Sequence, residues 1–311
     1  MGKFNISGLK RRQLLAAGVA AAGATALGAM PASEVSSWSR QVDVIVVGSG
    51  AAGLCAAIEA AQAGASVLIL ESLAVPGGSS ALSGGVIYAG GGTALQRALG
   101  VQDSPEAMFN FLLRTGSPLP PRDKLELYCE ESPAHFDWLV AQGIPYTQKM
   151  TTMKGIPMGD ESLYFSGNEL AWPARDVAAP APRGHVPGVP GMNGGRTLMA
   201  VLADKVRGLG VAVQTRSTGQ QLVQESDGRV IGIAVQQEGR RQLLRARRGL
   251  VLACGGFVHN REMLRQYAPQ LARCSTPWGG AGDLGQGINM GIAAGAVSLR
   301  MNEGFAVAPI Y

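Results

Sequence analysis

Apolar and polar positions near the start of the chain are arranged as a strand, a helix and a second strand. Residues 43–47, apolar after the first position, and residues 67–70 are short runs that are typical of strands buried on both faces. Residues 51–63 between them carry small and apolar side chains, and Gly64 follows, which favours a helix that ends there. Glu71 comes directly after the second strand. This order predicts a βαβ unit.

The helical pattern returns further along the chain. Residues 104–114 open with a serine cap and a proline, and they predict a helix. Residues 121–142 predict one or two helices interrupted at Ser132-Pro133, and residues 195–209 predict an amphipathic helix that ends at a glycine. Five prolines lie between residues 172 and 191, so we expect a long loop without a regular element there.

Strand patterns dominate the second half of the chain. After a strand at residues 211–215, three runs separated by short glycine-containing turns predict a β-meander at residues 221–224, 229–236 and 241–247. Residues 249–253 are again apolar and predict a further buried strand. Helices and strands together predict an α/β fold.

The turn inside the βαβ unit carries the motif G-x-G-x-x-G at Gly48, Gly50 and Gly53. The first glycine allows a tight turn, the second lets the backbone approach a pyrophosphate, and the third lets helix and strand pack closely. The free N–H groups and the dipole at the helix N-terminus attract the anion. Glu71 lies 21 positions after Gly50, near the roughly 20 expected for a carboxylate that accepts from ribose hydroxyls. The unit therefore predicts dinucleotide binding, and a purely structural glycine turn is the alternative.

Three further glycine-rich segments follow. Residues 76–85 (PGGSSALSGG) offer unhindered N–H groups and small hydroxyls, which suits a loop along a phosphate and a flat ring better than a flexible linker. The strand at 249–253 ends in Cys254-Gly255-Gly256, where the chain would approach the nucleotide again. Gly282-Asp283 then leads into a helix near residues 288–294, and this aspartate is either a helix cap or an acceptor for a ligand hydroxyl.

Charge and cysteine content exclude some classes of function. The formal charge is +5, of which residues 1–34 contribute +3 through Lys3, Lys10, Arg11 and Arg12 against Glu34. The remaining +2 is too small to indicate nucleic-acid binding. The cluster of arginines at 240–248 is expected to be a solvated face. The four cysteines show neither metal-ligand spacing nor a disulfide framework, so we expect no metal site.

The first residues are typical of an export signal. Residues 1–34 begin with basic residues, among them Arg11-Arg12, and continue with a weakly apolar stretch at 14–29. This pattern is similar to a bacterial twin-arginine signal, with a possible cleavage site at Ala24-Thr25-Ala26. The stretch is too short and too weakly apolar for a stable membrane span, which needs about 20 strongly apolar residues. We expect a linker at 35–41, and periplasmic or exported protein, or cytoplasmic protein if the signal is unused. A disordered alanine-rich N-terminus is the alternative.

These segments, in this order, resemble the flavoprotein family of soluble fumarate reductase, the succinate dehydrogenase flavoprotein subunit and 3-ketosteroid dehydrogenases. The resemblance runs from about residue 43 to the last residue, and GGSSALSGGVIYAGGG and PRGHVPG look most like the steroid-dehydrogenase branch. It implies a Rossmann-like FAD-binding domain of the glutathione-reductase type over residues 42–311, with a parallel sheet, a β-meander and helical insertions.

The resemblance implies FAD as the cofactor. Relatives that hold flavin covalently carry a histidine where this chain has Gly78, so noncovalent FAD is expected. Glu71 would bind the adenosine ribose, Gly219 would approach the adenine and Asp283 would close the site. The residues implied to contact FAD are Gly48, Ser49, Gly50, Ala51, Ala52, Gly53, Glu71, Ser72, Gly77, Gly78, Ser79, Ser80, Ser83, Gly84, Gly85, Gly219, Gly255, Gly256 and Asp283.

The implied reaction adds or removes hydrogen across a carbon–carbon bond activated by a carbonyl group. The substrate would be steroid-like or an unsaturated dicarboxylate, with an unidentified electron partner. The relatives are longer, so a cap domain and a C-terminal FAD segment are expected to be missing. The catalytic residue is unassigned, with Tyr88, Tyr311, Arg183 and His185 as candidates. The alternatives are a truncated, catalytically inactive FAD-binding fragment and an NAD-dependent dehydrogenase. A binding site for a nicotinamide cofactor, however, needs neither the glycine-serine loop nor the meander.

Overall fold

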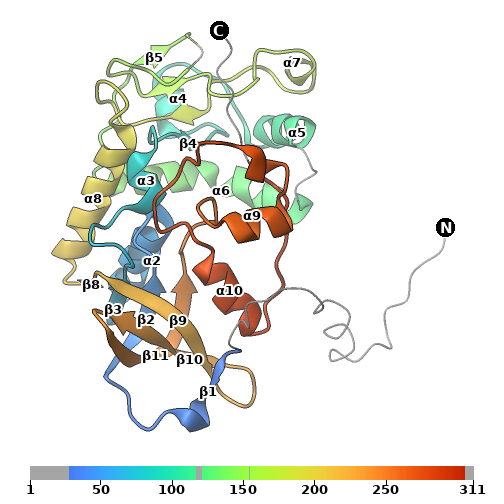
Figure 1. Ribbon diagram of the computed structural model, residues 1–311. Helices are drawn as coiled ribbons and strands as arrows, with labels where there is room; N and C mark the ends of the chain where they lie inside the picture. Colours follow the sequence, from blue (N-terminus) through green and yellow to red (C-terminus); the bar gives the residue numbers. More distant parts are fainter. Residues whose placement is uncertain (1–27, 117–120, 154, 305–311) are drawn as a thin grey trace.

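A seven-stranded sheet forms the centre of the computed structural model, which describes residues 28–116, 121–153 and 155–304 (Figure 1). The strand order is β1-β9-β10-β11-β2-β3-β8. In that order the strands span Met30–Pro31, Ser217–Gln224, Val230–Gln237, Arg240–Leu252, Arg40–Val47, Val67–Leu70 and Ala212–Gln214.

The sheet is mixed, because the β-meander belongs to it. β11, β2, β3 and β8 are parallel neighbours, whereas β9, β10 and β11 pair antiparallel as predicted for the meander. The βαβ unit is confirmed, with β2 and β3 joined by α2 (Ala51–Gln62). An α/β arrangement with a mixed sheet is therefore present.

β11 corrects the prediction of two separate strands at 241–247 and 249–253. It is one strand that pairs with β10 over its first half and with β2 over its second, with a register shift between Ala246 and Gly249. Arg247 and Arg248 lie in this irregularity and contact Asp43, so their charges mark a bulge and not a strand end. The end of β11 is also less buried than predicted, since Val251 and Leu252 are 37% and 38% exposed.

The two faces of the sheet bury different side chains, as the strand period of two requires. On one face, Val46 of β2 packs with α2 and with α8 (Gly194–Gly208). On the other face, Ile45 and Val47 pack with Ile233 of β10 and with Met290 of α10 (Gln286–Ala293). The cradle, which is the βαβ unit of β2, α2 and β3 with its glycine motif, is thus attached to the best-buried part of the molecule.

A second, smaller sheet with its own helices lies at the opposite end of α8 from the main sheet's β8 edge (Figure 1). Its order is β4-β7-β6-β5, with bounds Ile87–Tyr88, Gly184–His185, Leu163–Tyr164 and Met150–Thr151. The helices beside it are α4 (Ala94–Ala98), α5 (Pro105–Thr115), α6 (Arg122–Ala141) and α7 (Ala174–Val177), whereas α3 (Gly78–Leu82) packs against α8.

Three predictions for residues 78–191 were wrong. Residues 78–82 form a short helix and not a loop, and the 172–191 segment contains α7 and β7. α6 continues through Pro133, which the sequence predicted to interrupt it. Phe136 and Cys129 on this helix are buried, so tertiary packing offsets the hydrogen bond that proline removes.

The N-terminal part of the fold begins earlier than the predicted boundary at residue 42. Met30 in β1 is buried against Val223 and Ile231, and a 3₁₀ turn at Ala32–Glu34 follows. These residues were predicted to belong to the signal segment, whereas the twin-arginine pair and the cleavage site lie outside the described residues. In the part of the chain that is described, no helix is long and apolar enough to cross a bilayer.

The remaining elements close the molecule near the carboxyl end of the main sheet. α9 (Arg261–Tyr267) and a 3₁₀ turn at Leu271–Arg273 precede α10. The loop at 279–285 lies between them, and it is held by a hydrogen bond from Gly285 N to the carbonyl oxygen of Gly256.

Candidate cofactor site

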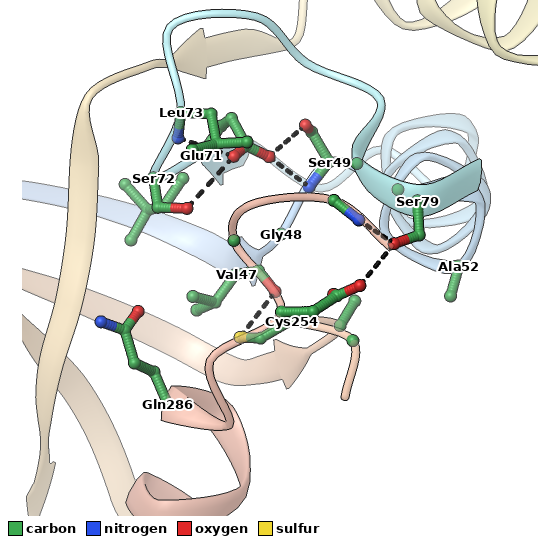
Figure 2. A pocket seen from close by; sticks show the side chains of 18 of the residues that line it. Val47, Gly48, Ser49, Ala52, Glu71, Ser72, Leu73, Ser79, Cys254 and Gln286 are labelled. Carbon is green, nitrogen blue, oxygen red and sulfur yellow. Dashed lines mark hydrogen bonds between the residues drawn. The ribbon is translucent and has the colours of Figure 1, made fainter. Parts of the chain in front are cut away.

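A pocket opens at the carboxyl ends of β2, β3 and β11, beside the N-terminus of α2 (Figure 2). This is where open α/β sheets bind ligands, because the loops after neighbouring parallel strands diverge there. Glu71 and Asp283 are the charged residues of its lining. A bound pyrophosphate would therefore be held by backbone N–H groups and the α2 dipole and not by basic side chains.

Most of the residues predicted from the sequence line this pocket. Thirteen of them do: Gly48, Ser49, Gly50, Ala51, Ala52, Glu71, Ser72, Gly78, Ser79, Ser80, Gly219, Gly255 and Asp283. Six do not: Gly53, Gly77, Ser83, Gly84, Gly85 and Gly256.

The three glycines of the motif have separate physical reasons. Gly48 has a φ of +107°, and a Cβ atom there would overlap the carbonyl of Ala253, the residue after β11. A Cβ at Gly53 would overlap the carbonyl oxygen of Gly48, so this glycine allows helix and strand to pack. Gly50 faces open space apart from Ser80 Oγ at 3.4 Å, and it leaves room for a ligand at the start of α2. The tight turn at Gly48 and the close packing at Gly53 are as the motif predicted, whereas the approach of a pyrophosphate at Gly50 stays a prediction.

Glu71 is buried and accepts hydrogen bonds on both carboxylate oxygens (Figure 2). Oε2 accepts from Ser49 N at 3.1 Å and from Ser49 Oγ. Oε1 accepts from Leu73 N at 2.8 Å and from Ser72 Oγ at 3.3 Å. These neutral donors fix the carboxylate at the edge of the pocket, where a ribose hydroxyl is expected.

Two serines of α3 connect this helix, which lines the pocket, to the start of α2 and to the 279–283 loop. Ser80 Oγ accepts from Ala51 N at 3.1 Å, at the N-terminus of α2. Ser79 Oγ donates to the carboxylate of Asp283 and accepts from Gly280 N at 2.6 Å. Asp283 therefore does not cap a helix through its side chain, but ties the 279–283 loop to α3.

Several lining residues were missed by sequence reasoning. They are Val47, Leu70, Leu73, Ser217, Ala253, Cys254, Gly280, Gly282, Gln286 and Met290. Most of them flank the predicted glycines and Glu71, so their positions could have been inferred from the strand ends. Cys254 donates to the carbonyl of Val47 at 3.3 Å, and burial raises the pKa of its thiol to about 11, which keeps it neutral.

Gly84 and Gly85 are close to other parts of the protein. A Cβ at Gly85 would overlap the backbone of Gly194 and Gly195 at the start of α8. A Cβ at Gly84 would meet Ile156, with Met192 at 3.4 Å. The structure thus supplies a packing reason for both glycines, and their predicted contact with the flavin stays a prediction.

The catalytic candidates Arg183 and His185 lie away from this pocket, in a closed polar cluster beside the second sheet. Arg183 binds Asp103 through two hydrogen bonds of 2.9 and 2.7 Å, and both side chains are 0% exposed. Burial opposes the charge on Asp103, but the hydrogen bonds and charge of Arg183 outweigh it and hold its pKa below the usual value. His185 contacts Thr93 Oγ1 at 2.9 Å, and burial lowers its pKa to about 4.

Tyr88 belongs to the same cluster, and Tyr311 lies outside the described residues. The ring of Tyr88 stacks on Phe111, whose face also receives the guanidinium of Arg183 at 5.2 Å. Burial raises the pKa of Tyr88 well above its usual value, so the phenol stays protonated. Among the described residues, no group of histidine, cysteine and acidic side chains could hold a metal ion.

Known proteins are similar to this chain in sequence and in fold. The chain is 37% identical over 204 residues to the 3-oxo-5-alpha-steroid 4-dehydrogenase of Comamonas testosteroni, covering 64% of this chain and 38% of that protein. Its fold matches the crystal structure of the 3-ketosteroid-delta4-(5alpha)-dehydrogenase of Rhodococcus jostii RHA1 in complex with 4-androstene-3,17-dione, with a TM-score of 0.85 and 41% identity over 89% of this chain and 58% of that one. A flavocytochrome c3 fumarate reductase in an open conformation matches with a TM-score of 0.69 and 26% identity, covering 84% and 41%.

The chain spans between 38% and 58% of the length of these three relatives. The sequence pattern of the FAD binding domain family matches residues 43–309, which include most of β2, all later strands of the main sheet and the whole pocket. The cradle glycines, Glu71 and the pocket agree with that match, and the chain therefore belongs to the FAD binding domain family, with FAD as its cofactor.

Proposed function

We propose that this chain is the FAD-binding part of an oxidoreductase that adds or removes hydrogen across a carbonyl-activated carbon–carbon bond. The observation that carries the proposal is the cofactor pocket, together with 37% and 41% identity to two enzymes named for the dehydrogenation of 3-oxosteroids. Bound FAD would supply the group that takes or gives hydride. The chain's own residues would bind the pyrophosphate and the ribose and hold the wall formed by α3 in place.

Each wall of the pocket has a separate task in this proposal. Backbone N–H groups at the start of α2 bind the pyrophosphate, and Glu71 binds the ribose. The bond between Ser79 and Asp283 keeps α3 against the 279–283 loop, which narrows the pocket between the two. This enclosure limits access of water to the cofactor.

The surface around Gly84 favours a steroid-like substrate over a dicarboxylate. Leu82 and Met192 near this glycine are both exposed, and Ile156 approaches it directly. Apolar side chains that face solvent beside a predicted flavin site suit an apolar ring system. A dicarboxylate would instead call for clustered cations, and its support is the likeness to the fumarate reductase.

The fold is consistent with the glutathione-reductase type. In this chain a βαβ cradle is followed by a meander whose last strand, β11, returns to pair parallel with β2. That arrangement supports the finer assignment, because it brings Gly255 back to the cradle.

Noncovalent attachment is also part of the proposal. Gly78 lines the pocket at the position where covalently flavinylated relatives carry a histidine. Acid precipitation of the purified protein should release intact FAD into the supernatant. Flavin that stays with the pellet would contradict noncovalent binding, and NAD without flavin would overturn the cofactor assignment.

A second part of the proposal concerns location. The twin-arginine leader predicted within residues 1–34 would end before β1, because Met30 is already part of the folded sheet. Replacing both Arg11 and Arg12 by lysine should keep the protein in the cytoplasm of a host with twin-arginine machinery. Unchanged periplasmic accumulation in fractionated cells would show that the pair is incidental.

The activity is tested by turnover with two substrate classes. We expect FAD-loaded protein that contains this chain to reduce a dye in the presence of 3-oxosteroids. Oxidation of reduced viologen by fumarate without steroid turnover would overturn the substrate class. Tight FAD binding with neither activity, both for residues 1–311 and for any longer reading frame, would favour a noncatalytic binding fragment.

A further inference from the structure

We propose that Ser49 is a positioning residue, which holds Glu71 in place for the ribose and links it to α3. In the same proposal, a ribose hydroxyl of bound FAD replaces the hydroxyl of Ser72 as a hydrogen-bond donor to Glu71. The inference rests on FAD as the cofactor and goes beyond it, because it assigns separate tasks to two serines of the pocket. Neither task follows from the glycine motif.

Ser49 is fully buried and both of its polar groups are engaged (Figure 2). Its N–H and its hydroxyl both donate to Oε2 of Glu71, and its Oγ accepts from Gly77 N at 3.3 Å. A hydroxyl with this set of partners is committed to protein groups. It therefore acts on a ligand through Glu71 and Gly77.

The other oxygen of Glu71 has a donor that can leave. A carboxylate offers about four acceptor positions, and here Ser49 and the donors Leu73 N and Ser72 Oγ use four. A ribose hydroxyl must replace one of them. Ser72 makes the longest of these bonds, at 3.3 Å, and is only partly buried, so its hydroxyl can turn to water. A displaced backbone N–H would be left unpaired.

The link to Gly77 connects the ribose end of the pocket to α3. Gly77 has a φ of +122° and caps the N-terminus of α3, and this helix carries Ser79 and Ser80. Those serines bind Asp283 and Ala51 N. The Ser49 hydroxyl therefore affects both the ribose carboxylate and the wall formed by α3.

ADP and FAD separate the two effects, because ADP contains the ribose and both phosphates but no flavin. We expect Ser49→Ala to weaken ADP binding to the flavin-free protein by about tenfold, because a Glu71 carboxylate that is no longer held in place loses most of its hydrogen bond to the ribose, and a bond to a charged group contributes about that much. FAD binding should weaken by more, because it also depends on the wall formed by α3. In a Glu71→Ala background the effect of Ser49→Ala on ADP should largely disappear. Ser49→Cys, which keeps a weak donor, should recover part of the affinity.

Ser72→Ala is expected to act in the opposite direction. With its competitor gone, Oε1 of Glu71 should bind ADP severalfold more tightly, and this gain should vanish in the Glu71→Ala background. Weaker ADP binding by Ser72→Ala would show that this hydroxyl supports the ligand and does not yield to it.

Ser132→Ala is the matched control. Ser132 is a buried serine whose Oγ accepts from a glycine N–H, Gly90 N at 3.0 Å, and it is not part of the pocket lining. It should lower stability with unchanged ADP affinity. Wild-type ADP and FAD affinity in Ser49→Ala, or equal weakening with and without Glu71, would overturn the inference. Wild-type protein that binds neither ligand would instead overturn the cofactor assignment.

Discussion

Two buried carboxylates in this protein are held in opposite ways. Glu71 in the pocket accepts from serine hydroxyls and backbone N–H groups, whereas Asp103 beside the second sheet binds the guanidinium of Arg183 through two hydrogen bonds. Among the donors to Glu71, the partly buried Ser72 hydroxyl is neutral and can be exchanged for a ligand hydroxyl at small cost. A charge-assisted pair from which water is excluded cannot be exchanged without leaving a charge buried.

The kind of donor therefore distinguishes a carboxylate that can bind a ligand from a carboxylate that has a structural role. Arg183 and His185 were catalytic candidates from their place in a proline-rich loop, but both are closed off in the Asp103 cluster. His185 packs against Phe136, and both of its ring nitrogens have hydrogen-bond partners inside the protein, Thr93 Oγ1 and the carbonyl of Arg183. The cluster holds β4 and β7 together, because Ala89 N also bonds to the carbonyl of Arg183.

The largest effect is expected from Asp103→Ala. Removal of one partner of a buried ion pair leaves the Arg183 charge uncompensated, which costs about 3–5 kcal/mol of the free energy of unfolding. Urea unfolding at pH 7 measures this loss. Asp160→Ala, which breaks an exposed pair with Lys149, is the control and should change stability very little. An equally small loss in Asp103→Ala would show that the cluster is not a closed structural unit.

Glu71→Ala should weaken cofactor binding. Loss of a charge-assisted hydrogen bond to ribose costs about 1.5–3 kcal/mol, or roughly tenfold to a hundredfold in FAD affinity. Flavin titration of the apoprotein measures it, with Glu225→Ala, which removes an exposed salt bridge to Arg229, as the control. Wild-type FAD affinity in Glu71→Ala would exclude this carboxylate from the site.

His185 should make the protein less stable in mild acid. Its pKa is about 4 in the folded protein, below the ordinary value of about 6.5 expected in the unfolded chain. Between these values the unfolded chain takes up a proton that the folded protein does not. The free energy of unfolding should therefore fall as the pH falls from 6.5 to 4, at up to about 1.4 kcal/mol per pH unit.

Urea unfolding at pH 7, 6 and 5 tests this slope. Burial also lowers the pKa of His135, so the contribution of His185 is the difference between the wild type and His185→Gln. Identical slopes in the two proteins would show that folding does not lower the pKa of His185.

The smallest effect is expected from Ser80→Ala, which removes the acceptor for Ala51 N. The loss of one neutral hydrogen bond at the edge of the pocket should cost about 1 kcal/mol of the free energy of unfolding in the absence of ligand. Chemical unfolding without FAD measures it. A loss as large as that of Asp103→Ala would erase the contrast between the two regions.

The sequence by itself determined the parts of this protein whose structure depends on neighbouring residues. The cradle strands, the helix after Gly50, the meander turns and Glu71 were all predicted, because apolar periodicity, glycine conformations and strand ends are local properties. Membership of the FAD binding domain family followed from the order of these segments.

Only the tertiary structure decided the rest, because the groups involved are far apart in the sequence. Asp103 and Arg183 are 80 positions apart, and Ser79 and Asp283 are 204 apart. α6 continues through Pro133, and β11 continues through its bulge, because packing against other elements outweighs the local signal to stop. Local patterns predict elements, whereas the burial and pairing of polar side chains depend on which distant segments fold against them.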